Sequence, residues 1–147
     1  MPYFTDFKTL SDLVEETFVE LMKDPAIKAK ALESKLTVKF EYRDPDGELW
    51  VDCKTDEVVT IPHKPDTEME LDATLSMESD VAHAFWCGKL NLLGAMSSGQ
   101  IVSEGSVPRL LKLLPVIKPA YAIYNGLLDA KGLGDLKIVD EDEEDDD

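Results

Sequence analysis

One stretch of the chain, residues 85–124, carries more apolar surface than the buried stripe of a single amphipathic helix needs. Its sequence reads FWCGKLNLLGAMSSGQIVSEGSVPRLLKLLPVIKPAYAIY. It contains no paired carboxylates, no His or Cys residues at metal-ligand spacing and no glycine-rich phosphate loop. Such a surface must be buried against the protein itself, against a partner or around an apolar ligand, and we favour the ligand.

Length and composition are those of one globular domain. A chain of 147 residues can bury a core of its own, and 44% hydrophobic with 31% charged residues is ordinary for a soluble protein. No apolar run approaches the roughly 18 residues that span a bilayer, and the first residues do not read as a signal peptide. Cys53 and Cys87 are too few for a disulfide framework. These features predict a cytoplasmic protein with reduced cysteines.

Acidic residues are concentrated at the end of the chain. Residues 140–147 read DEDEEDDD, and without them the net charge of −16 becomes −8, from 23 acidic and 15 basic residues. Like charges repel and bury no apolar area, so we expect a folded domain over 1–135 and a disordered tail over 136–147. The balance argues against a nucleic-acid partner, which requires clustered Lys and Arg. The tail is either a solvating appendage or a docking segment for a protein partner.

The first half of the chain predicts two helices and then four strands. Apolar residues recur at helical spacing over 7–22, and Asp24 with Pro25 ends this helix and starts a shorter one. The period then changes to two, with a turn over 44–47 in which Gly47 is expected to supply a positive φ. The strands are expected to form an antiparallel meander over residues 36–42, 48–53, 58–61 and 68–75, the last with Met69, Leu71, Ala73 and Leu75 inward.

The second half predicts further helices and a fifth strand. Ser76 suits the N-cap of a helix that ends at Gly88, and a second helical piece ends at Gly99. The later elements are a strand over 100–103, a Leu-rich helix capped by Ser106 and a last helix over 120–130.

Residues able to carry out chemistry are scattered through the chain. His63 and His83 are each isolated from other metal ligands, so both are interpreted as surface or structural histidines. Cys87 follows a helix C-terminus, which raises the pKa of a thiol and disfavours a nucleophile. Trp50 and Trp86 are interpreted as packing residues. We therefore predict no catalytic residue, no metal site and no cofactor, and hence no enzyme.

An ordered set of residues in the apolar stretch is similar to a known family. The segment GKLN at 88–91 is followed by AMSSG at 95–99, then by a short strand, Gly105 and the Leu-rich helix. On this order the chain resembles the sterol carrier protein type 2 family, also called nonspecific lipid-transfer proteins, most clearly over 70–118. The residues that carry the resemblance are Phe85, Gly88, Lys89, Leu90, Met96, Gly99, Ile101, Gly105 and Leu110.

The resemblance implies both a fold and a binding site. The fold is α+β: a five-stranded, mostly antiparallel sheet is covered on one face by about five helices. Together they enclose an apolar tunnel that accepts sterols, fatty acids, fatty acyl-coenzyme A or phospholipids. Binding would be driven by removal of the ligand from water. The residues expected to line the tunnel are Phe85, Trp86, Leu90, Leu93, Met96, Ile101, Leu110, Leu113, Leu114, Ile117, Tyr121, Tyr124 and Leu128.

Three cations, Arg109, Lys112 and Lys118, lie on the polar side of the Leu-rich helix. They are either a solvated face or a rim that receives an anionic head group such as a carboxylate, a phosphate or coenzyme A. A lipid carrier would also contact membranes transiently. The alternative from another class is a non-catalytic accessory or scaffold protein, which presents a hydrophobic intermediate to a partner enzyme and docks through the acidic tail.

Overall fold

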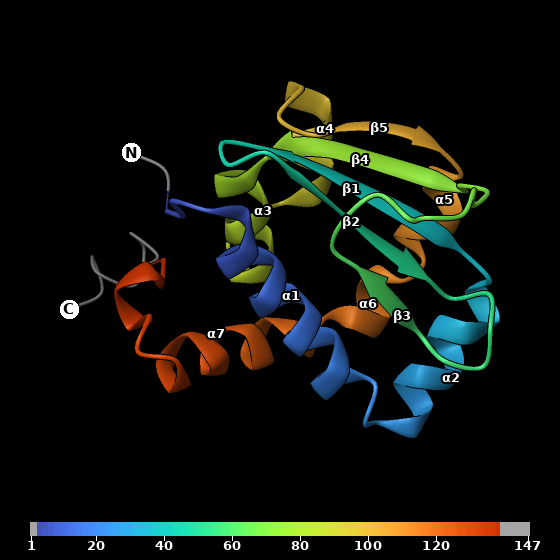
Figure 1. The fold of residues 1–147 in the computed structure, drawn as a ribbon, viewed down its shortest axis with the longest axis horizontal. Coiled ribbons are helices and arrows are strands. Elements are labelled where there is room, and N and C mark those ends of the chain that lie inside the picture. The colour runs from blue at the N-terminus through green and yellow to red at the C-terminus, as the bar shows by residue number, and fades with distance from the viewer. Residues whose placement is uncertain (1–2, 139–147) are drawn as a thin grey trace.

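Five strands form one mixed sheet in the order β3-β2-β1-β4-β5 in the computed structural model, which describes residues 3–138 (Figure 1). The β1–β4 pair is parallel and the other three pairs are antiparallel. The predicted α+β class with a mostly antiparallel sheet is therefore confirmed. The strands are β1 (Thr37–Arg43), β2 (Gly47–Asp52), β3 (Val59–Ile61), β4 (Ala73–Glu78) and β5 (Val102–Gly105).

The central strand β1 shows how the sequence sets the two faces of the sheet. Val38, Phe40 and Tyr42 alternate along it and are all buried under the helices. Lys39 and Glu41 point to the opposite face, where the Lys39 ammonium lies 2.6 Å from the Glu41 carboxylate. Because side chains alternate along a strand, the apolar residues form a continuous floor for whatever the helices enclose.

The expected meander is wrong at the fourth strand. β4 lies beside β1 and runs parallel to it, with Phe40 opposite Leu75, rather than beside β3. The connection of residues 62–72 carries the chain past β2 and β1 to reach this position (Figure 1). Parallel neighbours need a long crossover of this kind, which periodicity alone does not reveal.

The end of β4 also differs from the prediction. Ser76 is not a helix N-cap, because its hydroxyl donates to the Glu41 carboxylate at 3.0 Å across the β1–β4 pair. The strand continues to Glu78, so that Met77 joins the buried face and the next helix begins at Ser79. Leu71 was expected to face inward but is exposed, because it precedes the strand.

The described residues form seven α-helices and one short 3-10 helix, against about five helices expected. One of the additional helices is a short element that follows the Leu-rich helix and has Pro115 in its first turn, as expected from the position of this proline. The helices cover one face of the sheet (Figure 1). They are α1 (Phe7–Leu21), α2 (Pro25–Ser34), α3 (Ser79–Trp86), α4 (Leu92–Ser98), α5 (Val107–Leu111), α6 (Leu114–Ile117), α7 (Ala120–Ala130) and η1 (Gly134–Leu136).

Local signals set several helix boundaries as predicted. The Asp24 carboxylate accepts hydrogen bonds from the backbone N–H groups of Ala26 and Ile27 at the start of α2. Gly88 and Gly99 follow α3 and α4 with φ of 80° and 84°, a conformation that favours glycine. In the turn before β2, by contrast, Asp44 has the positive φ and Gly47 does not. A side chain at Gly47 would instead overlap the Phe7 ring.

The end of the described chain packs against the domain. Leu136 and Ile138 lie against the hydrophobic core, although the acidic tail was expected to begin at residue 136. The predicted boundary between domain and tail stays a prediction, since residues 139–147 lie outside the described part of the chain.

Candidate functional site

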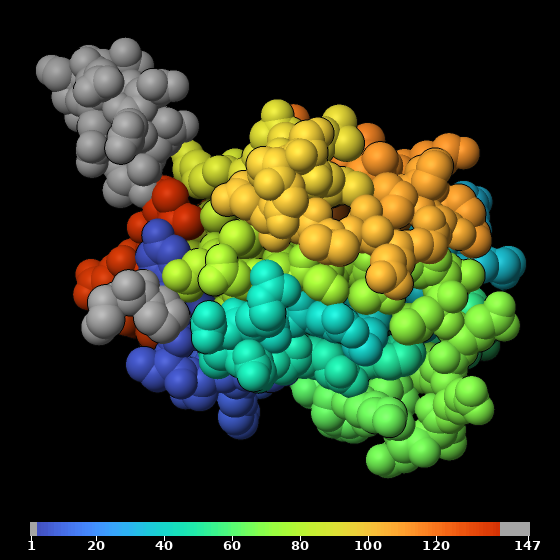
Figure 2. Space-filling view, turned by 90° about the horizontal axis from the view of Figure 1, so that it is seen from above, coloured from blue at the N-terminus to red at the C-terminus, as the bar shows by residue number. Residues whose placement is uncertain are grey.

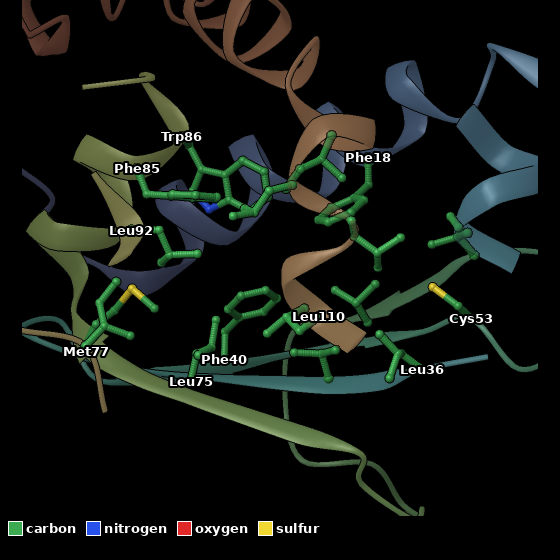
Figure 3. Close-up of a pocket in the computed structure, with 18 of the residues that line it drawn as sticks. Phe18, Leu36, Phe40, Cys53, Leu75, Met77, Phe85, Trp86, Leu92 and Leu110 are labelled. Carbon is green, nitrogen blue, oxygen red and sulfur yellow. The ribbon is translucent and has the colours of Figure 1, made fainter. Parts of the chain in front are cut away.

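A cavity of about 80 Å³ lies between the sheet and the helices (Figure 3). Strands β1, β2 and β4 supply its floor, and side chains from the helices and the segments between them close it. The lining residues are Phe18, Met22, Ala31, Leu36, Val38, Phe40, Tyr42, Val51, Cys53, Val58, Leu75, Met77, Phe85, Trp86, Leu92, Ile101, Leu110, Leu113, Leu114 and Ile117.

Aromatic side chains fix one end of this cavity. The ring of Trp86 at the end of α3 packs edge-on against Phe85 and against Phe18 of α1, with centroid distances of 5.0 and 5.5 Å. Trp86 is fully buried. Edge-to-face packing of this kind holds large rings in one orientation, so this part of the wall is rigid.

The lining offers almost no polar chemistry. None of its residues is charged, and its polar side-chain groups are the Tyr42 hydroxyl, the Trp86 indole N–H and the Cys53 thiol. Burial raises the pKa of Cys53 to about 11, so the thiol stays protonated at neutral pH. Among residues 3–138 there is also no group of three or more His, Cys, Asp or Glu residues placed to hold a metal ion. The cavity can therefore hold apolar groups, and its thiol is not activated.

The helices α5 and α6 form the weakest wall of the cavity. Leu110, Leu113, Leu114 and Ile117 come from this short segment, and none of them is fully buried. Figure 2 shows a small hollow among the segments coloured for α4, β5 and α5. Short helices with little buried surface open at low cost in free energy, so the cavity is most easily enlarged on this side.

Seven of the thirteen residues predicted to contact lipid lie in this lining. Each belongs to a helix or to a segment beside one. They are Phe85, Trp86, Ile101, Leu110, Leu113, Leu114 and Ile117.

The other six predicted residues lie outside the lining. Tyr124 and Leu128 are fully buried on α7, in the core that α7 shares with α1. The Tyr121 ring packs edge-on against Phe85, with centroids 5.8 Å apart, behind the cavity wall. Leu93 is 58% exposed on α4. The remaining two, Leu90 and Met96, are partly buried against the core without reaching the cavity.

Most of the lining that sequence reasoning missed comes from the sheet and from α1. Phe40, Val51 and Leu75 belong to strands whose alternation already identified a buried face. That alternation could have placed them in the site, because the floor of a cavity under a helical layer must be the inner face of the sheet. Phe18 and Met22 lie at the end of the apolar stripe predicted over residues 7–22, which indicated that they are buried but not that they line a cavity.

Two of the three predicted head-group cations line a surface groove of about 400 Å³ beside the cavity. Arg109 and Lys112 lie there together with Lys30 and Glu33 of α2, and Leu113 lines both the groove and the cavity. The Arg109 guanidinium donates to the backbone carbonyl of Ser34 at 2.7 Å, so it also ties α5 to α2. Lys118 is exposed after α6 and does not line the groove.

His83 is a buried structural histidine and takes no part in the cavity lining. Its Nε2–H donates to the Leu136 carbonyl at 2.6 Å, and its Nδ1 accepts from the Tyr124 hydroxyl at 2.7 Å. A carbonyl only accepts, which fixes the neutral ring with the proton on Nε2. The ring thereby joins α3 to α7 and to η1. Its sequence-based interpretation as surface or structural is consistent with this position.

Burial lowers the pKa of His83 below the ordinary value of 6.5, which makes stability depend on pH. The unfolded chain takes up a proton near pH 6.5 and the folded protein resists it, so the free energy of unfolding should fall as the pH drops below 6.5. Urea unfolding between pH 7.5 and 5.5 measures this slope. The slope should diminish in His83→Gln and persist in His63→Gln, whose ring is exposed. Equal slopes in the two variants would contradict the assignment to His83.

The described residues thus form an α+β domain whose sheet and helices enclose an apolar cavity. The sequence matches the model of the SCP-2 sterol transfer family over residues 16–118, and the chain belongs to this family. The resemblance drawn from the glycine pattern is thus confirmed. No curated protein matches the chain.

Solved structures share the fold at low sequence identity. Sterol carrier protein 2 from Yarrowia lipolytica in its apo form gives a TM-score of 0.60 at 16% identity, over 74% of this chain and 89% of that one. Sterol carrier protein domain 2 of Helicoverpa armigera gives 0.58 at 18%, over 78% and 87%. The UbiJ-SCP2 ubiquinone synthesis protein gives 0.57 at 15%, over 82% and 95%. Within residues 3–138, no helix is long and apolar enough to cross a membrane.

Proposed function

We propose that this protein is a non-catalytic lipid carrier of the cytoplasm, which holds a sterol, a fatty acid or a fatty acyl chain between its sheet and its helices. The observation that carries the proposal is a cavity whose lining contains no charged residue and closes over the inner face of the sheet. Membership of the SCP-2 sterol transfer family supports the same assignment. The free thiols of Cys53 and Cys87 agree with a reducing compartment.

The driving force for binding is the removal of hydrocarbon from water. Each buried CH₂ contributes about 0.8 kcal/mol, so a chain of about 16 carbons gains roughly 10 kcal/mol before entropy losses. Met22 and Met77 in the lining are flexible enough to fit several ligand shapes. Broad specificity for apolar chains follows from such a lining.

Binding has to enlarge the cavity. Its volume of about 80 Å³ equals that of roughly three water molecules, while small-molecule sites commonly measure about 300–1,000 Å³. Outward movement of α5 and α6 supplies the missing space, because these helices bury no residue completely. The continuous tunnel implied by the family resemblance would be the open form of this cavity.

The experiment that tests the carrier function is titration of the purified protein with a fluorescent fatty acid. We expect saturable binding of one ligand per protein, displaced by unlabelled fatty acid and by cholesterol. Absence of saturable binding by correctly folded protein would contradict the proposal. Native mass spectrometry of the same preparation identifies any lipid that purifies with the protein.

We further propose that the groove beside the cavity receives anionic head groups. Leu113 separates the cavity from the side chains of Lys30 and Lys112, so a chain that leaves the cavity at Leu113 places its head group among these cations. Glu33 in the same groove opposes them in part. Of the other two cations predicted to bind a head group, Arg109 also holds α2 through its hydrogen bond to Ser34, and Lys118 lies outside the groove.

Charge reversal tests this groove. Lys30→Glu combined with Lys112→Glu should weaken binding of a fatty acyl-coenzyme A about ten-fold and leave cholesterol binding unchanged, because only the former offers phosphates. Competition against the fluorescent fatty acid measures both affinities. Lys118→Glu is the matched control and should have little effect. An equal loss in the control would indicate general electrostatic attraction rather than a head-group site.

An accessory role alongside an enzyme is the second candidate. One protein with this fold is a ubiquinone synthesis protein, and the acidic residues 140–147 of the present chain offer a docking segment for a basic partner. A stable protein complex in native mass spectrometry, formed by the full chain and lost when residues 140–147 are removed, would favour this role. Lipid without a protein partner would favour the carrier.

A further inference from the structure

One buried polar group of the cavity wall has no hydrogen-bond partner within residues 3–138: the hydroxyl of Tyr42. Tyr42 lies on β1, lines the cavity and is only 3% exposed. The rings of Phe7 and Phe40 pack near it, with centroids 5.9 and 6.2 Å away, and they offer no acceptor atom. A hydroxyl in this position has lost its hydrogen bonds to water and gained none in return.

The polar group beside this hydroxyl cannot accept its hydrogen. Burial raises the pKa of Tyr42, and the nearby indole N–H of Trp86 partly opposes this rise because it is a hydrogen-bond donor. The Tyr42 hydroxyl and the Trp86 indole nevertheless do not form a hydrogen bond with each other. An indole N–H only donates, so closer approach of Trp86 would still leave the hydroxyl hydrogen of Tyr42 without an acceptor. Trp86 lines the same cavity, and its nitrogen lies on the ring edge turned toward the sheet (Figure 3). Two donors thus converge on one part of the wall.

The other deeply buried tyrosine of the domain shows a different arrangement. Tyr124 is fully buried, yet its hydroxyl donates to His83 Nδ1 at 2.7 Å, and it does not line the cavity. A buried tyrosine that packs in the core away from the cavity therefore has a hydrogen-bond partner for its hydroxyl in this fold. Tyr42, which borders the cavity, lacks such a partner among the described residues.

The ligand is the remaining source of an acceptor. A buried water here would accept hydrogen bonds from Tyr42 and Trp86 but would leave its own two hydrogens without acceptors, because apart from these groups and the Cys53 thiol the lining is apolar. An ionised carboxylate is unsuited to this position, because the lining contains no cation to pair with it. A neutral carbonyl or hydroxyl oxygen satisfies the donors without bringing in a charge.

We propose that Tyr42 is the polar anchor of the cavity, donating a hydrogen bond to a neutral acceptor oxygen of a lipid that binds with this oxygen inside, beside Trp86. The inference rests on the proposed carrier function and names its ligand class: neutral lipids with a carbonyl or hydroxyl oxygen, such as sterols and long-chain ketones or esters. Lipids with anionic heads would enter chain first.

The test compares two probes that differ in one oxygen: a long-chain methyl ketone and the alkane of the same length. Each displaces diphenylhexatriene, a fluorescent hydrocarbon, from the full-length protein. Because the two probes differ in their own cost of leaving water, each affinity is compared between the wild type and the variant. Tyr42→Phe should bind the ketone about ten-fold more weakly than the wild type does, the size of one net hydrogen bond, while alkane affinity is unchanged. The infrared C=O band of the bound ketone should move to higher frequency in the variant.

Tyr124→Phe is the matched control, since it removes a partnered hydroxyl outside the cavity. It should lower the thermal midpoint and keep the wild-type affinity for the ketone, whereas ligand-free Tyr42→Phe should be at least as stable as the wild type. The inference is overturned if Tyr42→Phe keeps the wild-type affinity for the ketone, if Tyr42→Phe is less stable than the wild type, or if Tyr124→Phe loses ketone affinity to the same extent. A wild type that binds neither probe counts against the carrier function itself.

Discussion

Replacing Leu110 by Asp should abolish lipid binding, with a loss of affinity of about 100-fold or more. Leu110 of α5 points into the cavity between the sheet and Trp86 (Figure 3). A carboxylate there either leaves water or holds α5 away from the sheet, and an uncompensated polar group in an apolar site costs roughly 2–7 kcal/mol, which at the lower end is already more than 20-fold in affinity. Titration with the fluorescent fatty acid measures the loss, and circular dichroism checks that the variant is folded.

The matched control for this prediction is Leu93→Asp. Leu93 was also expected in the lining from the sequence, but its side chain is 58% exposed on α4. The same change of side chain should therefore leave fatty-acid affinity within about two-fold of the wild type, because the carboxylate stays in water. If folded Leu110→Asp binds as tightly as Leu93→Asp, the cavity is not the lipid site.

The largest loss of stability from a single methyl group is expected at Gly105. This residue ends β5 opposite Ala73 with φ of 89°, and a Cβ there would overlap the backbone carbonyl oxygen of Asp72. The strained backbone costs about 1–3 kcal/mol and the overlap costs about as much again, so Gly105→Ala should lose roughly 4 kcal/mol in the free energy of unfolding. Urea unfolding measures the change.

Gly99→Ala separates the two contributions. Gly99 has a similar φ of 84°, but no atom lies within 4 Å of the position its Cβ would take. Only the strain of a positive φ in a residue with a Cβ applies at this position, so Gly99→Ala should lower the free energy of unfolding by about 1 kcal/mol. Equal losses at both glycines would show that contact with Asp72 contributes nothing. Because Gly105 leads directly into α5, Gly105→Ala should also weaken lipid binding in protein that stays folded.

Local sequence patterns were sufficient wherever short-range physics decides the outcome. Helical spacing predicted α1, and the proline after Asp24 marked the start of α2. Alternation predicted the buried face of β1, and the last helix was expected over the residues that α7 occupies. These features depend on side chains a few residues apart, which the sequence displays directly.

Long-range pairing was beyond the reach of such patterns. The hydroxyl of Ser76 would suit a helix N-cap, but β4 lies beside β1, where Ser76 bonds to Glu41. The local preference of Ser76 was overridden by a neighbour 35 residues away. In the same way, Tyr124 and Leu128 of α7 have the apolar character of tunnel residues, yet they pack into the core beside α1.

The amino-acid sequence was sufficient to identify the apolar stretch that supplies part of the site and the ordered glycines typical of the SCP-2 family. Which apolar side chains surround the cavity and which fill the core depends on the tertiary structure, because both groups are hydrophobic and differ only in what lies opposite them. The tertiary structure also placed Tyr42 in the wall without a hydrogen-bond partner among residues 3–138. Whether a hydroxyl on the buried face of a strand has a hydrogen-bond partner depends on residues that are distant in the sequence, so it can be judged only from the tertiary structure.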